Sequence, residues 1–329
     1  PIGSLLTHTG RITADGGQVV LITAPAAKAV LDQVINLSGT IQADTIAQHS
    51  GRIVLLGQGG RVDVSGTLSA QGIQPGQSGG TIDLLGDSVH LASGARIDAS
   101  GPSGGGTIHL GGAFQGQGTT YRAQTNTIDT GTQLNADATA NGHGGEVIVW
   151  ADGHTAYAGE ISARGGPQGG DGGRVEVSGK GSLDFQGNVD AGAPQGMAGS
   201  LLLDPTYLTI GLAEAGLISR VLRTGTSTTL AADIDINVNA AIDGRGRRAG
   251  GGLTFNAGHD INVNDFIITN NGLINLLASG GTVNMAPGTA LFAGNAPITV
   301  RTGGTLSTGN LITTGALNVT STGGSVNVD

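Results

Sequence analysis

The sequence contains no cysteine, so it forms no disulfide, offers no thiolate nucleophile and binds no metal through sulfur. Aromatic residues make up only 3% and charged residues only 12% of its 329 positions, which excludes a core of large side chains. No apolar run reaches the roughly 18 residues of a membrane-spanning helix. The 24 acidic residues outnumber the 15 basic ones, and the resulting net charge of −9 argues against nucleic acid as a partner.

Glycine is the most conspicuous residue type, with 62 positions against only 9 for proline. Because it does not recur strictly at every third position, a collagen helix is excluded. Hydrophobic residues still reach 38%, so the composition is not that of a disordered chain. The glycines mark a repeat, a Gly-Gly pair followed by alternating apolar residues, with copies at 59–66, 79–84, 105–110, 144–149, 172–179, 280–285 and 323–328.

Two further short apolar alternations follow most copies, as at 88–91 and 94–99. Three strands within a period of 20 to 29 residues leave no room for a helix, and stacking is the economical arrangement. We therefore predict an all-β fold, a right-handed parallel β-helix with three short strands per coil and about 11–12 coils. The paired glycines are expected at its corners, where the backbone needs a positive φ.

The alternation also predicts which side chains point inward, because neighbours along a strand face opposite sides. The inward set comprises Val62, Val64, Ile82, Leu84, Ile108, Leu110, Val147, Val149, Val175 and Val177. The outward set comprises Asp63, Asp83, His109, Glu176, Asn284 and Asn327. On this assignment Val175→Asp destabilises the fold strongly, whereas Glu176→Val changes its stability by less than about 0.5 kcal/mol.

Three stretches depart from the strand pattern. Apolar spacings of three and four residues predict short helices at 26–34 and 214–223. The long period at 112–144 is interpreted as an excursion from the repeat. No linker divides the chain, so 1–329 is expected to be a single elongated segment. Since the sequence starts at Pro1 without a visible signal peptide and ends within a repeat, we expect it to be a section of a longer chain.

Two places stand out as a possible ligand or partner surface. Ile148 and Trp150 occupy outward positions that are polar in other copies, so they form either a platform for stacking sugars or a patch covered by the 112–144 excursion. The cluster of Arg245, Arg247 and Arg248 is either a solvated loop or a site for an anionic sugar.

Motifs with catalytic precedent are weak here. The Gly-x-Ser-x-Gly patterns at 76–80 and 101–105 precede strands rather than helices, so they are interpreted as turns. The pairs Asp152–His154 and His259–Asp260 lack a visible third partner. The alternating Asp and Asn residues at 233–239 offer oxygen ligands for calcium but match no known calcium loop. We therefore expect no enzymatic activity, no cofactor and no required metal.

Four stretches in a fixed order, 144–153 (GGEVIVWADG), 159–166 (GEISARGG), 172–180 (GGRVEVSGK) and 199–205 (GSLLLDP), resemble the filamentous haemagglutinin-like exoproteins of bacterial two-partner secretion. The resemblance covers most of the chain, and 26–36 is similar to the helical insert after that family's secretion domain. The secretion domain itself, with its Asn-Pro-Asn-Gly type motif, is not found.

The resemblance implies the shaft region of a large adhesin, exported by a signal peptide, carried across the outer membrane by a dedicated β-barrel partner, and displayed on the cell surface or released. It implies no catalytic residues. The expected function is therefore a structural shaft in cell–cell or cell–surface attachment, as in biofilms or host adhesion, with carbohydrate or another adhesin molecule as a possible partner. The alternative is a carbohydrate-binding or polysaccharide-cleaving β-helix.

Overall fold

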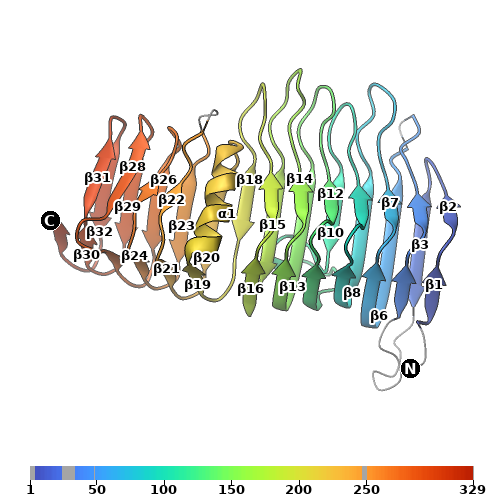
Figure 1. The fold of residues 1–329 in the computed structure, drawn as a ribbon, viewed down its shortest axis with the longest axis horizontal. Helices are drawn as coiled ribbons and strands as arrows, with labels where there is room; N and C mark the ends of the chain where they lie inside the picture. The colour runs from blue at the N-terminus through green and yellow to red at the C-terminus, as the bar shows by residue number, and fades with distance from the viewer. Residues whose placement is uncertain (1–3, 24–33, 48, 247–249, 329) are drawn as a thin grey trace. The chain divides into compact units, whose positions relative to one another are not determined.

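The computed structural model describes residues 4–23, 34–47, 49–246 and 250–328, and it is all-β with parallel sheets. The chain divides into two compact units, 1–199 (unit 1) and 200–329 (unit 2), which are described separately. The prediction of one elongated segment concerns how the units are joined and stays a prediction. In each unit, successive repeats place their strands side by side (Figure 1).

Unit 1 contains two parallel sheets among its described residues. The first consists of β1 (Leu6–His8), β3 (Gln18–Thr23), β4 (Ile35–Leu37), β6 (Arg52–Val64), β8 (Thr81–Leu91), β10 (Thr107–Leu110), β11 (Ala123–Ile128), β13 (Glu146–Tyr157), β15 (Arg174–Gly179) and β16 (Ser182–Phe185). The second consists of β2 (Arg11–Thr13), β5 (Thr40–Gln42), β7 (Thr67–Ser69), β9 (Arg96–Asp98), β12 (Gln133–Asn135), β14 (Glu160–Ser162) and β17 (Asn188–Asp190).

Unit 2 contains three parallel sheets among its described residues. Their strands are β18 (Ser200–Leu203), β20 (Ser227–Ala232), β23 (Leu253–Ala257), β26 (Ile274–Ala278), β29 (Ile298–Thr302) and β32 (Leu317–Ser321) in the first; β19 (Leu208–Ile210), β21 (Ile236–Val238), β24 (Ile261–Val263), β27 (Val283–Met285), β30 (Leu306–Thr308) and β33 (Val326–Val328) in the second; and β22 (Ile242–Asp243), β25 (Ile267–Ile268), β28 (Ala290–Gly294) and β31 (Asn310–Thr313) in the third. Each strand pairs with its equivalent in the next repeat, as in the register Ile236–Ile261–Val283.

The predicted inward set is confirmed. All ten of its side chains are fully buried, so small branched residues build the core in place of aromatic ones. Two aromatics in the core of unit 1, Tyr157 and Phe185, stack with their ring centroids 5.5 Å apart. At about 25 cal/mol per Å² of apolar surface, files of buried Val, Ile and Leu replace what large side chains supply in other cores.

The predicted reason for the paired glycines holds only in part, because Gly59 has the predicted positive φ of 74° but lies within β6. Those that open the repeats at 79, 105, 144 and 172 do not have a positive φ. A Cβ atom at these positions would instead lie between 1.7 and 2.0 Å from the carbonyl oxygens of Ala99, Ala136, Ala163 and Ala191, respectively. The repeat therefore needs glycine because two backbone segments approach each other too closely for any side chain.

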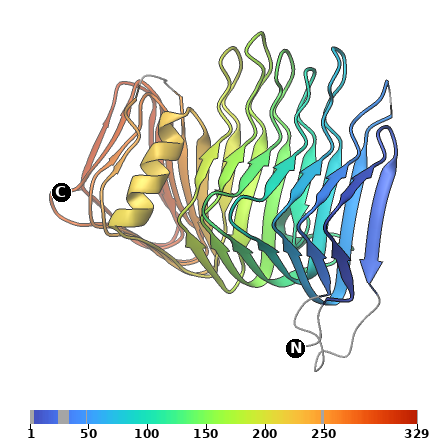
Figure 2. The same cartoon turned by 45° about the vertical axis from the view of Figure 1, so that its right-hand side comes forward.

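The helix predicted at 214–223 is confirmed as α1 (Leu212–Arg223), which lies against strands of unit 2 (Figure 2). The carboxylate of Glu214 accepts a hydrogen bond from the backbone N–H of Gly211 at 3.0 Å, which caps the first turn. The buried face includes Ile218, Val221 and Leu222. The helix predicted at 26–34 falls almost wholly outside the described residues.

The predicted excursion at 112–144 is shorter in the structure. Strands β10 and β11 are two halves of one row, because both pair with β8 and both pair with β13. The chain leaves the row at Gly111 and returns at Ala123, whose N–H donates to the carbonyl oxygen of Gly111 at 2.7 Å. We call residues 111–122 the covering loop, which contains the short 3-10 helix η1 (Phe114–Gly116). After it, β11 and β12 resume the sheets.

Candidate functional site

The covering loop folds back over the outer face of the first sheet of unit 1. The backbone N–H of Gln115 donates to Oε2 of Glu176 at 2.8 Å, and the guanidinium of Arg174 lies 4.3 Å from the centroid of the Phe114 ring. At its other end, the hydroxyl of Tyr121 accepts a hydrogen bond from the N–H of Gly59 at 3.2 Å and donates to Asp87. These contacts fix the loop to three different strands, β6, β8 and β15.

Ile148 and Trp150 are buried beneath this loop, so the expectation of an exposed sugar platform is wrong. Ile148 is completely inaccessible and Trp150 is 5% exposed. The Trp150 ring packs so closely on Gly116 that a Cβ there would lie 2.6 Å from Cε2. The indole N–H donates to Asp152 at 3.0 Å, which satisfies its polar atom. The alternative of a covered patch is the one that the structure contains.

The same loop overturns the assignment of Glu176 to solvent. Its side chain is completely buried, and Oε1 also accepts a hydrogen bond from Oγ of Ser178 at 2.8 Å. Asp63 and Asp83 are also buried, at 9% and 7% exposure, whereas Asn284 and Asn327 are exposed as predicted. Alternation gave the correct side of the strand for Glu176 but not its burial, because the covering loop lies on that side.

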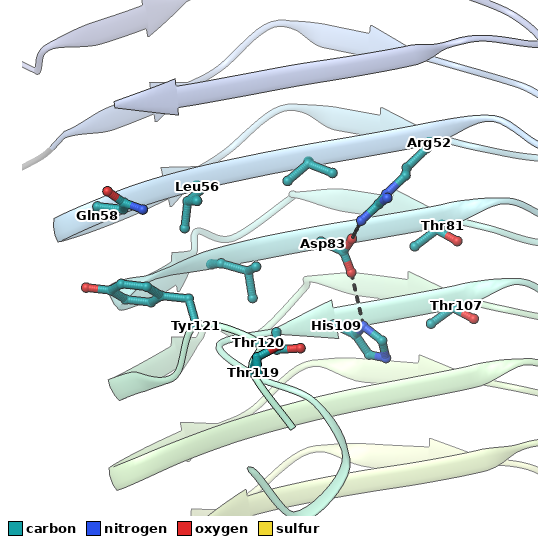
Figure 3. Close-up of a pocket in the computed structure, with 12 residues that line it drawn as sticks. Arg52, Leu56, Gln58, Thr81, Asp83, Thr107, His109, Thr119, Thr120 and Tyr121 are labelled. Atoms are coloured by element: carbon teal, nitrogen blue, oxygen red, sulfur yellow. Dashed lines mark hydrogen bonds and ion pairs between the residues drawn. The ribbon is translucent and has the colours of Figure 1, made fainter. Parts of the chain in front are cut away.

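A groove of about 690 Å³ opens where the loop meets strands β6, β8 and β10 (Figure 3). Thr119, Thr120 and Tyr121 of the loop form one wall. The floor is apolar at Leu56 and Leu85. Toward the other end of the strands it carries the charged groups of Arg52, Asp83 and His109.

The charged end belongs to a chain of five side chains that we call the charge ladder: Arg52, Asp83, His109, Glu146 and Arg174. Asp83 accepts from Arg52 at 3.0 Å and contacts Nδ1 of His109 at 3.0 Å, as the dashed lines in Figure 3 show. Nε2 of His109 contacts Glu146 at 3.2 Å, and Glu146 accepts from Nε of Arg174 at 2.7 Å. Each member comes from a different strand, so the ladder crosses five rows.

The ladder holds its groups in their charged forms. Burial lowers the pKa of His109, but its hydrogen bonds to Asp83 and Glu146 outweigh this and raise the pKa to about 9. Burial raises the pKa of Asp83, yet the hydrogen bonds from His109 and Arg52 keep it below its ordinary value. The hydrogen bond from His109 likewise lowers the pKa of Glu146. Both imidazole nitrogens therefore bind carboxylates, and this set offers neither a free base nor a protonated carboxyl group at neutral pH.

The two His–Asp pairs identified in the sequence have different surroundings in the structure. Asp152 binds Arg122 at 3.0 Å, while His154 contacts the hydroxyl of Ser182 at 2.8 Å, so this pair does not act together. His259 gains Asp235 as a third partner: Nδ1 lies 3.0 Å from Asp235 and 3.3 Å from Asp260. His259 is exposed, Asp235 and Asp260 are half-buried, and the three residues are hydrogen-bonded to one another. Along 233–239, the polar face instead forms an amide ladder, in which Asn262 donates to Asn237 and Asn284 donates to Asn262 at 2.9 and 3.1 Å.

Of the arginine cluster, Arg247 and Arg248 lie outside the described residues. Arg245 is exposed and binds Asp243 through Nε and one terminal nitrogen, at 2.9 and 2.7 Å. It lines a second groove, of about 630 Å³, in unit 2. This groove could not be predicted from the sequence, because its other lining residues come from three different repeats.

Comparison with models of known protein families found no match, and comparison with curated proteins found no relative. Among the described residues, no helix combines the length and the apolar character needed to cross a membrane.

Proposed function

We propose that the chain is a structural shaft section of a secreted, surface-displayed bacterial adhesin, which mediates attachment between cells or of cells to a surface. The observation that carries the proposal is the row-by-row parallel pairing within each unit, since a repeat that contacts only its neighbours extends without limit in one direction. The covering loop supports a structural role as well, because it seals an apolar face. In this proposal the chain is not an enzyme.

The finer architecture belongs to the same proposal. Parallel strands joined by crossover connections are right-handed in about 98% of cases, which favours a right-handed β-helix in each unit. Each coil contributes one strand to a second sheet. Among the described residues these sheets have seven strands in unit 1 and six in unit 2, slightly more than the 11 to 12 coils predicted. The excess follows from the shorter repeats of unit 2, where paired positions of the second sheet are 20 to 25 residues apart from β21 onward.

The polysaccharide-cleaving alternative has less support. Cleavage by paired carboxylates requires one protonated and one free carboxyl group. In the charge ladder both carboxylates are ionised and bound to cations. The outer-membrane β-barrel secretion partner remains part of the adhesin proposal and rests on the sequence resemblance.

Antibodies against the purified chain test the proposal in the bacterium that produces it. They should label intact cells, and deletion of the gene should reduce attachment. Complementation with a gene that encodes Asn318→Thr, an exposed position, should restore attachment, whereas Val175→Asp in the core should not. An antibody against a cytoplasmic protein serves as the permeability control. Labelling that appears only after permeabilisation would contradict surface display.

A further inference from the structure

The third sheet of unit 2 carries an apolar file on its outer face. Ile268, Phe292 and Ile312 form this file at successive paired positions on β25, β28 and β31, and Asp243 of β22 precedes it. Ile312 is 47% exposed, and Ile268 and Phe292 are half-buried. The outer face of the neighbouring second sheet carries the amide ladder instead. An apolar file in contact with water is unfavourable unless a ligand or a partner covers it.

Aromatic rings widen this file into a platform. Phe266, which precedes β25, is 43% exposed, and its ring lies 6.4 Å from the ring of Phe292 at an interplanar angle of 43°. Amide side chains border the groove beside the platform at Asn271 and Asn295, whose backbone N–H donates to Oδ1 of Asn271 at 3.1 Å. Apolar rings next to amides provide both kinds of contact that a sugar needs, C–H faces to stack and hydroxyls to bind.

The charge at one end of the groove is positive. Arg245 lines it, and exposed Arg223 donates to the backbone carbonyl oxygen of Asp243 at 2.8 Å, so a second cation lies beside the residue whose carboxylate binds Arg245. The described lining residues include no Asp or Glu, in a chain whose net charge is −9. Arg245 uses two nitrogens on Asp243, and a guanidinium has five N–H donors, so donors remain for an anionic ligand.

We propose that this groove binds an acidic oligosaccharide that contains uronic acid. Pyranose rings stack on Phe266 and Phe292, hydroxyl groups bind the asparagine amides, and a uronate carboxylate lies against Arg245. The volume of about 630 Å³ accommodates a few sugar rings and is small for a protein interface. The inference goes beyond the proposed shaft function, because a shaft needs no ligand, and either proposal stands if the other fails.

Titration calorimetry with a galacturonic acid trimer and a neutral galactose trimer tests the proposal. We expect tighter binding of the acidic trimer and a loss of this preference at high salt. Arg245→Gln should weaken binding of the acidic trimer about tenfold and leave the neutral trimer unchanged. Phe292→Thr should weaken both about five- to tenfold, and Phe266→Ser, at a more exposed site, should act in the same direction. Ile22→Thr in unit 1, where the side chain is 56% exposed, is the matched control and should change neither.

Urea unfolding of each variant verifies that the fold is retained. Absence of binding to either trimer would overturn the proposal, as would affinities unchanged by both Arg245→Gln and Phe292→Thr. Analytical ultracentrifugation tests the other possible occupant, a second copy of the chain. Self-association that Phe292→Thr abolishes would assign the platform to contacts between copies and would also overturn the proposal.

Discussion

Replacing His109 with Gln tests the charge ladder, because it removes the charge but keeps hydrogen-bonding groups. The pKa of His109 rises from 6.5 to about 9 on folding, which corresponds to about 3 kcal/mol of stability. Only 19% of this side chain is exposed, so solvent screens the interaction weakly. A raised pKa means that the folded state binds the proton more tightly. The stabilisation is therefore complete below pH 6.5 and is lost as the pH rises through about 9.

Urea unfolding at about pH 6 and about pH 9.5 measures this effect. From the lower to the higher pH, the difference in free energy of unfolding between the wild type and His109→Gln should shrink by about 2–3 kcal/mol. His154→Gln is the matched control, since the exposed ring of His154 contacts a hydroxyl group rather than carboxylates. Its difference from wild type should stay constant. If the difference for His109→Gln were also the same at both pH values, protonation of His109 would not stabilise the fold and the reasoning would be refuted.

Two further substitutions probe the core and the covering loop. Val175→Asp places a carboxylate without a partner in a fully buried position and should lower the free energy of unfolding by about 3–5 kcal/mol in urea titrations; an unchanged midpoint would contradict the inward assignment. Gly116→Val introduces a β-branched side chain at a φ of +62° and against the Trp150 ring, so it should lift the loop at a cost of about 1–3 kcal/mol and raise acrylamide quenching of Trp150, the only tryptophan. Quenching equal to wild type would show that the cover does not depend on close packing at Gly116.

Strand periodicity was sufficient to predict the core, because alternation fixes the direction of a side chain such as Val147 within a strand. It could not predict where the chain re-enters the sheet after the covering loop. The strand at 123–128 (AQTNTI) has weak alternation, and its inward Asn126 is fully buried, with its amide donating to the carbonyl oxygen of Trp150 at 2.8 Å. A buried amide in place of an aliphatic side chain hides the strand from a search for apolar alternation.

The charge ladder was not predictable for a related reason. Asp83 and His109 are 26 positions apart, and His109 and Glu146 are 37 apart, because the second interval contains the covering loop. The repeat copies at 79–84 and 105–110 place Asp83 and His109 at equivalent positions, but the copy at 144–149 places Ile148, not Glu146, opposite His109. Glu146 pairs with Thr107 and reaches Nε2 of His109 diagonally, a side-chain contact that the repeat alignment does not reveal.

The base of the covering loop, where Ala123 bonds to Gly111, has a practical consequence. Twelve or so residues leave the row there, yet both halves keep their register with β8 and β13. An insertion at this bend therefore leaves the pairing of the neighbouring strands intact. Residues Lys180 and Gly181, between β15 and β16, form a bend one row beyond β13, directly after Gly179, which pairs with Ala151 as Ala123 does. A peptide epitope inserted between them would lie on the same side of the sheet as the covering loop. The protein can therefore serve as a display scaffold with one insertion site for each row.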